Sequence, residues 1–149
     1  MAAAARRATR SGPGLAARRL ALLALFEADF RPGLASEALE RLADERGVPP
    51  SVREHAAQVV VGVERHLTEI DARIASEAPA IPVAELGRVE RAILRSALYE
   101  VLYSAATPSG EPIRDAVSLA RIYAGDAARR LVNGVLGSVS RSSGRGAQP

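Results

Sequence analysis

The chain has 149 residues, of which 48% are apolar and 25% charged, with 20 arginines, no lysine, 17 acids, two histidines and no cysteine. This composition can build one domain with a hydrophobic core, and the missing cysteines exclude disulfides and thiolate metal sites. No apolar run reaches the ~18–20 residues that span a bilayer, and the N-terminal segment lacks the apolar stretch of a signal peptide. We therefore expect a cytoplasmic protein that uses no metal and no cofactor.

The net charge of +3 conceals an uneven distribution of charged residues. Residues 1–19 carry five arginines and no acid, residues 121–149 carry five arginines and one acid, and the segment between them carries ten arginines and sixteen acids. Basic ends on an acidic middle predict one surface for a polyanion and a separate surface for a basic partner.

Residues 1–14 show no apolar periodicity and end in Gly-Pro-Gly, which predicts a mobile basic arm. A first helix is predicted from about Leu15 to Phe30. It is apolar nearly all round, with Arg18 and Arg19 in its first turn. Cations at that end oppose the helix dipole, and a bound phosphate would reverse this cost.

A second helix is predicted from about Leu34 to Arg46, ending at Gly47. After two prolines, the run from Ser51 to Glu54 has the pattern of a capping box. It predicts the start of one long helix of about 27 residues that reaches Glu77. The apolar stripe on which this prediction depends consists of Val52, Ala56, Val59, Val63, Leu67, Ile70 and Ile74.

Two prolines, Pro79 and Pro82, separate this half from a central helix predicted within Glu85–Tyr103. Its apolar residues cover more than one stripe, so we expect it to contact helices on two sides. The remaining face holds Arg88, Arg91, Arg95 and Tyr99. Those arginines could meet acids of a neighbouring helix or an anionic ligand, and both interpretations stay open.

Two further helices follow, the first opening with Pro112 and ending at Gly125, the second capped by Asp126. Asn133 and Gly134 are unusual inside a helix, where glycine costs about 0.8–1 kcal/mol relative to alanine. We favour structural reasons for both, namely a close helix approach for the glycine and a side-chain hydrogen bond for the asparagine. Residues 141–149 are predicted to be a disordered tail.

The sequence contains no glycine-rich phosphate loop, no nucleophile motif and no strand pattern, so it predicts no active site. Arginine clusters alone are weak evidence for nucleic-acid binding, because aromatic residues amount to two phenylalanines and three tyrosines.

Several segments together resemble the NusB family of transcription antitermination factors. They are RRLALLALFEAD from Arg18, ELGRVERAILRSALYEVL from Glu85, IRDAVSLARIYAG from Ile113 after Pro108, and LVNGVLG from Leu131. The resemblance implies an all-α, seven-helix fold of two three-helix subdomains, at about 15–78 and 82–140, in one domain of residues 15–140. It also implies no catalytic activity and pairing with NusE, a small-subunit ribosomal protein. That pair would bind the single-stranded boxA element of ribosomal RNA leader transcripts and act with RNA polymerase and other Nus factors.

The resemblance places RNA contacts in an arginine-rich segment entering the first helix, on that helix and near the start of the last helix. The candidate RNA-binding residues of this chain are Arg6, Arg7, Arg10, Arg18, Arg19, Phe26, Arg95, Arg129, Arg130 and Asn133. The chain departs from the family in two places. Residues 14–17 read Gly-Leu-Ala-Ala where arginines are usual, and Leu131 stands where phenylalanine is common, which puts base stacking there in doubt.

The partner surface implied by the resemblance includes Glu90, which Arg91 could flank. The alternative for Glu90 is an ion pair with Arg91 or with an arginine of a neighbouring helix. Two other functions are compatible with the sequence. One is an accessory RNA-binding domain of a ribosomal RNA methyltransferase, for which the chain is too short unless it is a fragment. The other is a helical scaffold that binds protein without RNA.

Overall fold

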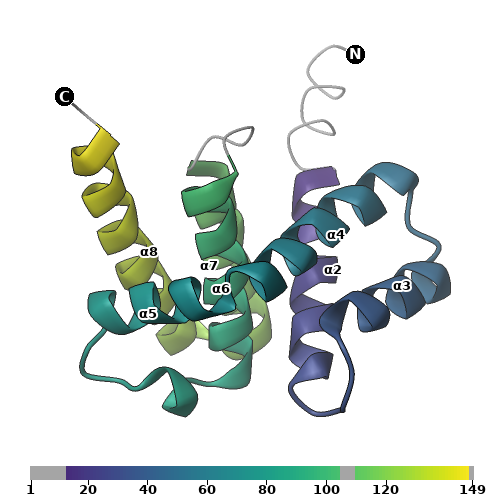
Figure 1. Cartoon of the computed structure of the whole chain (residues 1–149), viewed down its shortest axis with the longest axis horizontal. Coiled ribbons are helices and arrows are strands. Elements are labelled where there is room, and N and C mark those ends of the chain that lie inside the picture. The colour runs from purple at the N-terminus through teal and green to yellow at the C-terminus, as the bar shows by residue number, and fades with distance from the viewer. Residues whose placement is uncertain (1–12, 105–109, 148–149) are drawn as a thin grey trace. The chain divides into compact units, whose positions relative to one another are not determined.

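The computed structural model describes residues 13–104 and 110–147 (Figure 1). Within these ranges it contains α-helices, one short 3-10 helix and no strand. The elements are α2 (Pro13–Ala28), α3 (Ala35–Arg46), α4 (Pro50–Arg65), α5 (Leu67–Glu77), η1 (Val83–Glu85), α6 (Arg88–Tyr103), α7 (Gly110–Ala124) and α8 (Asp126–Ala147). The predicted all-α fold is confirmed, and the part of the chain that the structure describes holds the expected seven α-helices.

The chain forms two compact units, Met1–Val61 and Gly62–Pro149, so the division falls inside α4. The subdomains expected at 15–78 and 82–140 are a different partition, based on the prolines after α5 rather than on contacts. Each unit is described by itself below.

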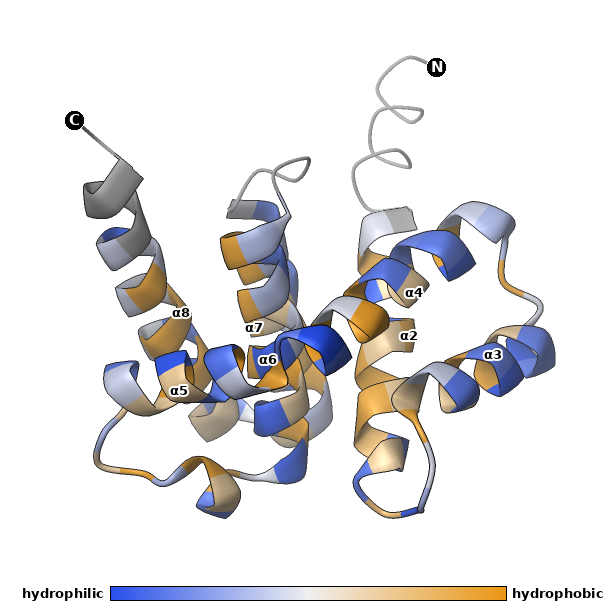
Figure 2. Ribbon diagram, in the orientation of Figure 1, coloured by the Kyte–Doolittle hydropathy of each residue, from blue (hydrophilic) through white to orange (hydrophobic). Residues whose placement is uncertain are grey.

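Facing apolar residues of α2 and α3 form the core of the first unit. α2 is apolar through most of its length, as its orange and tan colouring shows (Figure 2). Leu22 and Leu39 are both fully buried, which contributes about 1.5–3 kcal/mol each. α3 ends at Gly47, whose φ of +61° lies in the left-handed region, so the predicted glycine stop is confirmed.

The predicted capping box at Ser51 is wrong, because α4 begins one residue earlier, at Pro50. Proline fits the first helical position, where its missing N–H needs no partner. The amides of Val52 and Arg53 both donate to the carbonyl of Pro49 at 3.1 Å, so Ser51 lies inside the first turn.

The predicted long helix is broken at His66, which separates α4 from α5 and has φ −111° and ψ 21°. Hydrogen bonds still continue across the break, from the His66 amide to the Gly62 carbonyl at 3.0 Å and from the Ile70 amide to the His66 carbonyl at 2.9 Å. The break turns Leu67 outward, and this member of the predicted apolar stripe is exposed.

The second unit is built around α6, which packs against α5, α7 and α8. This confirms the prediction of a central helix with neighbours on more than one side. Ile93, Leu94 and Leu98 of α6 are buried, as are Ile74 of α5 and Leu136 of α8.

Gly62 is the position where the second unit needs a glycine for close approach. A Cβ there would lie 2.1 Å from the Cε1 of Tyr99. The ring of Tyr99 belongs to a cluster with His66 and Tyr103, in which His66 and Tyr103 stack with ring centroids 3.9 Å apart.

α7 begins at Gly110, so Pro112 lies inside its first turn and is not the first helical residue as predicted. The predicted cap at Asp126 is also wrong, because Asp126 is the first residue of α8 and the amide of Arg129 donates to the carbonyl of Gly125. α7 ends where Gly125 adopts a φ of +93°, and α8 starts at Asp126. α8 continues to Ala147, past the predicted start of a tail at Arg141. Contacts with α5 accompany this extension, because the hydroxyls of Ser138 and Ser142 both donate to the carboxylate of Glu77.

Candidate nucleic-acid interface

The predicted RNA-binding residues fall in both units, on α2 in the first and on α6 and α8 in the second. Three of them, Arg6, Arg7 and Arg10, lie outside the described residues. The other groups are taken below one helix at a time.

The first turns of α2 place their two arginines differently. Arg18 is buried, with only 4% of its surface exposed, and it has a partner within the protein. Arg19 is half-buried. Phe26, two turns further on, is half-buried and meets Phe30 edge to face, with ring centroids 4.9 Å apart and planes inclined by 63°. α2 and the turn that follows it therefore offer one arginine and an aromatic pair to their surroundings.

The first turn of α8 carries a compact ionic cluster. Arg129 Nε donates to one carboxylate oxygen of Asp126 at 2.7 Å, and Arg130 Nη1 donates to the other at 2.5 Å. The hydrogen bond from Arg129 holds the pKa of Asp126 below its ordinary value and raises the pKa of Arg129. Both guanidiniums keep other N–H groups, because each carries five in all.

Asn133 and Gly134, on the second turn of α8, are both exposed. A Cβ added at Gly134 would meet no atom of another element within 4 Å. The predicted close helix approach at this glycine is therefore wrong. The predicted side-chain hydrogen bond of Asn133 is absent as well, because the side-chain amide of Asn133 has no partner within the described chain. Together with Arg130 they form an outward polar face of α8 that packing does not explain.

The arginines of α6 are used within the second unit. Arg95 forms a bidentate pair with Asp71 of α5, Nε to Oδ1 at 2.9 Å and Nη2 to Oδ2 at 2.8 Å. Arg91 donates to the carbonyls of Val83 and Ala84 at 3.4 and 3.3 Å. For Arg95, the structure shows the ion pair with a neighbouring helix that was one of the two interpretations of this face.

Glu90 lies in the first turn of α6, with its carboxylate folded back over Gly87. A Cβ on Gly87 would lie 2.6 Å from the oxygens of that carboxylate. This position suits an acid, because the helix dipole favours negative charge at its N-terminal end. Glu90 forms no ion pair with Arg91 or any other described residue, so the intramolecular alternative is not what the structure shows.

Sequence reasoning missed two features. One is the cluster of His66, Tyr99 and Tyr103, for which the four-residue spacing of the tyrosines on α6 was the available signal. The other is a hollow of about 310 Å³ between α2 and α3, whose wall includes Phe26 and Phe30. Nothing in the sequence pattern marks that hollow, because its lining comes from two helices and the loop between them.

Other kinds of site were sought over the same described ranges. No group of three or more His, Cys, Asp or Glu side chains is arranged to hold a metal ion. None of the helices described is both long and apolar enough to cross a membrane.

The model of the NusB family matches residues 15–141, which is most of the chain. This chain belongs to the NusB family. The transcription antitermination protein NusB of Roseiflexus sp. (strain RS-1) is 37% identical to it over 124 residues, 82% of this chain and 87% of that protein. NusB-family proteins are non-enzymatic antitermination factors, so the expectation of no catalytic activity is confirmed by membership.

Two solved structures resemble the chain throughout. One is a crystal structure of the antitermination factors NusB and NusE in complex with double-stranded RNA, in which the matching chain is 29% identical to this one and has a TM-score of 0.79. The match covers 86% of this chain and 96% of that chain. The other is a crystal structure of a plectonemic RNA supercoil, in which the matching chain is 28% identical to this one and has a TM-score of 0.83. The match covers 89% of this chain and 96% of that chain. The NusB fold predicted from the sequence is thus confirmed.

Proposed function

We propose that this chain is an RNA-binding adaptor that takes boxA-type single-stranded RNA of ribosomal RNA leader transcripts, together with the ribosomal protein NusE. The pair would act in the cytoplasm and reach RNA polymerase indirectly, along with other Nus factors. The observation that carries the proposal is the outward face of α8, where Arg130, Asn133 and Gly134 have no role in packing.

The chemistry of that face suits a nucleic acid. Arg129 and Arg130 stand at the N-terminal end of α8, where the helix dipole also favours an anion. Each donates a hydrogen bond to Asp126 and keeps further N–H groups for a phosphate oxygen. Asn133 can hydrogen-bond a base edge, and the missing side chain at Gly134 lets a backbone or ribose approach the helix closely.

On α2 we assign direct contact to Arg19 and to the ring of Phe26. Phosphate contacts are assigned to Arg6, Arg7 and Arg10, which lie outside the described residues. Arg18 is buried and is better suited to holding the start of the helix in place. Arg95 is engaged with Asp71 and has the same kind of structural role.

For the protein partner we propose a contact at Glu90, with Arg91 beside it. The carboxylate is unpaired within the described chain, and a basic partner could supply its counter-ion. Glu90→Arg should weaken the association with NusE, by about 0–1 kcal/mol if the contact is exposed and by more if it is partly buried. Calorimetry with purified NusE measures this, with Glu85→Arg of η1 as a control; unchanged affinity would remove Glu90 from the interface.

The experiment that tests the RNA half is a salt titration of binding with and without NusE. The probes are a boxA-like single strand, a scrambled single strand and the corresponding duplex. Each phosphate contact should contribute about 0.7 to the slope of log affinity against log salt for a single strand. Arg130→Gln should lower that slope, whereas Arg65→Gln, at the end of α4, should leave it unchanged.

A second candidate function is a helical scaffold that binds protein without RNA. It is favoured by the first turn of α2, where Gly14-Leu15-Ala16-Ala17 provides no cation and Arg18 is buried. If no probe binds even when NusE is present, the scaffold becomes the better account.

A further inference from the structure

The hollow between α2 and α3 has the composition of a site for a planar ring. Its apolar walls come from both helices, and Phe30, 55% exposed, stands at its edge in contact with Phe26. The residues that line it are Leu23, Phe26, Glu27, Phe30, Arg31, Leu42 and Arg46. A volume of about 310 Å³ is at the small end for ligand pockets and suits one ring system rather than a longer segment.

The charges around this hollow favour an anionic ligand. Arg31 and Arg46 are both exposed, whereas the only acid in the lining, Glu27, is held by an ion pair with Arg41. The side chain of Arg46 forms no ion pair or hydrogen bond within the described chain and stands in the last turn of α3. The lining therefore carries two cations against one acid that already has a partner.

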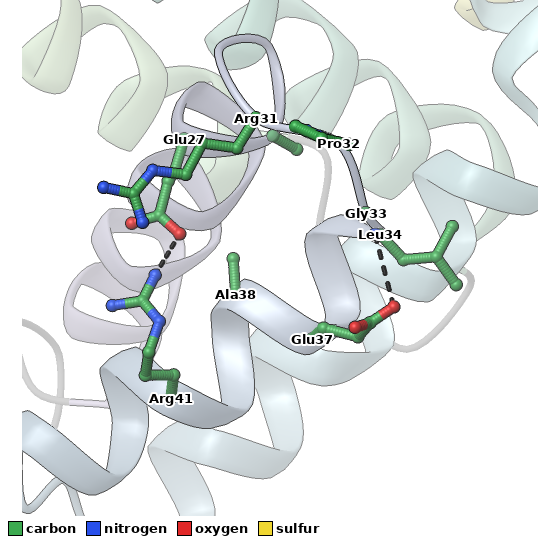
Figure 3. A pocket seen from close by; sticks show the side chains of 9 residues that line it. Glu27, Arg31, Pro32, Gly33, Leu34, Glu37, Ala38 and Arg41 are labelled. Atoms are coloured by element: carbon green, nitrogen blue, oxygen red, sulfur yellow. Dashed lines mark hydrogen bonds and ion pairs between the residues drawn. The ribbon is translucent and has the colours of Figure 1, made fainter.

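A neighbouring hollow shares Glu27 and Arg31 but differs in character (Figure 3). It is lined by two carboxylates and two guanidiniums, which cancel in charge. There Glu27 faces Arg41, and Glu37 accepts a hydrogen bond from the amide of Leu34. It offers no aromatic ring, so it serves as the internal comparison.

We propose that the hollow lined by Phe26, Phe30 and Leu42 binds one unstacked base of the RNA, with Arg31 and Arg46 meeting the adjoining phosphates. Base–aromatic stacking tolerates any base, because each has a π-face, and arginines beside it supply the contact to the backbone. A protein side chain would also fit the apolar walls, but it would leave Arg46 without an anion and Arg31 with only Glu27, which is already paired with Arg41. This inference rests on the proposed function and extends the RNA contact from α2 onto α3.

The test measures binding of a labelled boxA-like single strand to the full chain with NusE, using a series of RNAs that each lack one base. Phe30→Ala should weaken binding of the intact RNA by about 5- to 150-fold, the range for losing one base–aromatic stack. One base-less RNA should bind the parent chain more weakly than the intact RNA, and Phe30→Ala should not weaken that RNA further. Arg46→Gln should lower the salt slope by about 0.7.

Leu34→Ala and Arg65→Gln are the matched controls, since Leu34 is as exposed as Phe30 but lines the neighbouring hollow, and Arg65 also ends a helix. Both should bind like the parent. If the parent binds the RNA and Phe30→Ala binds it equally well, the inference fails while the proposed function stands. If Phe30→Ala weakens only the association with NusE, the hollow serves a protein and the inference is overturned. If the parent binds no RNA, the proposed function itself has failed.

Discussion

α6 and α8 lie in the same unit and both carry arginines, but only α8 has residues in its interior whose identity no contact within the unit explains. On α6, Arg95 is held by Asp71 and Arg91 by two backbone carbonyls. On α8, Asn133 and Gly134 face outward with no contact that explains them. The comparison shows that arginines on a helix face are weak evidence for a ligand, because neighbouring acids can account for them. A poor helix former that is exposed and unpacked is the stronger evidence.

The largest expected effect distinguishes Gly62 of α4, which packs against Tyr99 of α6, from Gly134 of α8. Gly62→Ala should lower the free energy of unfolding by about 1–3 kcal/mol, because the new Cβ would overlap the ring of Tyr99. Gly134→Ala should raise it by up to about 1 kcal/mol, since alanine is the better helix former and nothing obstructs it. Urea unfolding of both variants measures whether the free energy of unfolding falls in Gly62→Ala and rises in Gly134→Ala. A destabilised Gly134→Ala would mean that the outward face of α8 is packed after all.

The inner side of α8 gives the next effect. Ser138→Ala removes a hydroxyl that donates to the partly buried carboxylate of Glu77, at a cost of about 1–2 kcal/mol at neutral pH. The same hydrogen bond is the main cause that lowers the pKa of Glu77.

The sign of the pH dependence follows from that lowered pKa. The stabilisation is fully present above the pKa of glutamate in the unfolded chain, about 4.3, and is lost as pH falls through the lower pKa of the folded state. The parent and Ser138→Ala should therefore converge in stability in acid. A gap of the same size at every pH would show that the charge of Glu77 is not involved.

Arg95→Gln tests whether the arginine of α6 that is paired with Asp71 has a structural role. It breaks a bidentate, partly buried pair and should cost about 1 kcal/mol of stability, while leaving RNA affinity and its salt slope unchanged. Thermal unfolding and the RNA titration measure the two quantities. A lower salt slope would return Arg95 to the RNA-binding residues and weaken the contrast with α8.

The smallest expected effect concerns the cluster at the start of α8. Asp126→Asn keeps the size and shape of the side chain and removes the charge that competes with phosphate for Arg129 and Arg130. Affinity for a boxA-like strand should rise about two- to fivefold, as expected for a difference of ~0.4–1 kcal/mol. Asp44→Asn, which removes one of the two acids paired with Arg53 in the first unit, is the control. Equal affinity of parent and Asp126→Asn would place these arginines outside the RNA contact.

Local signals in the sequence predicted most of the fold. Gly47 and Gly125 end helices because both adopt positive φ, and the apolar residues of α6 predicted its neighbours on two sides. The break at His66 was missed, since the apolar stripe continues through Leu67 with no glycine or proline to mark a stop.

The candidate site was less predictable because it depends on which side of a helix other elements cover. Gly62 and Gly134 are both glycines inside helices, and only the position of Tyr99 distinguishes a required glycine from an exposed one. Likewise, the arginine pattern of α6 allowed either an ion pair or an anionic ligand at Arg95, and only the position of Asp71 on α5 decides for the ion pair. The hollow proposed to bind a base could not be predicted for the same reason. Phe30 and Arg46 are sixteen residues apart in the sequence and line the same hollow only because α2 packs on α3.

The carboxylate of Asp126 also bears on which RNAs the chain selects. Both of its oxygens accept hydrogen bonds from arginines, so an incoming phosphate must compete for Arg129 and Arg130 with a carboxylate of the same helix. A single phosphate or a short oligonucleotide gains little from that exchange, whereas a longer strand gains contacts elsewhere on the protein at the same time. We therefore expect affinity to rise steeply with strand length, so that abundant mononucleotides and inorganic phosphate in the cell compete poorly for this surface.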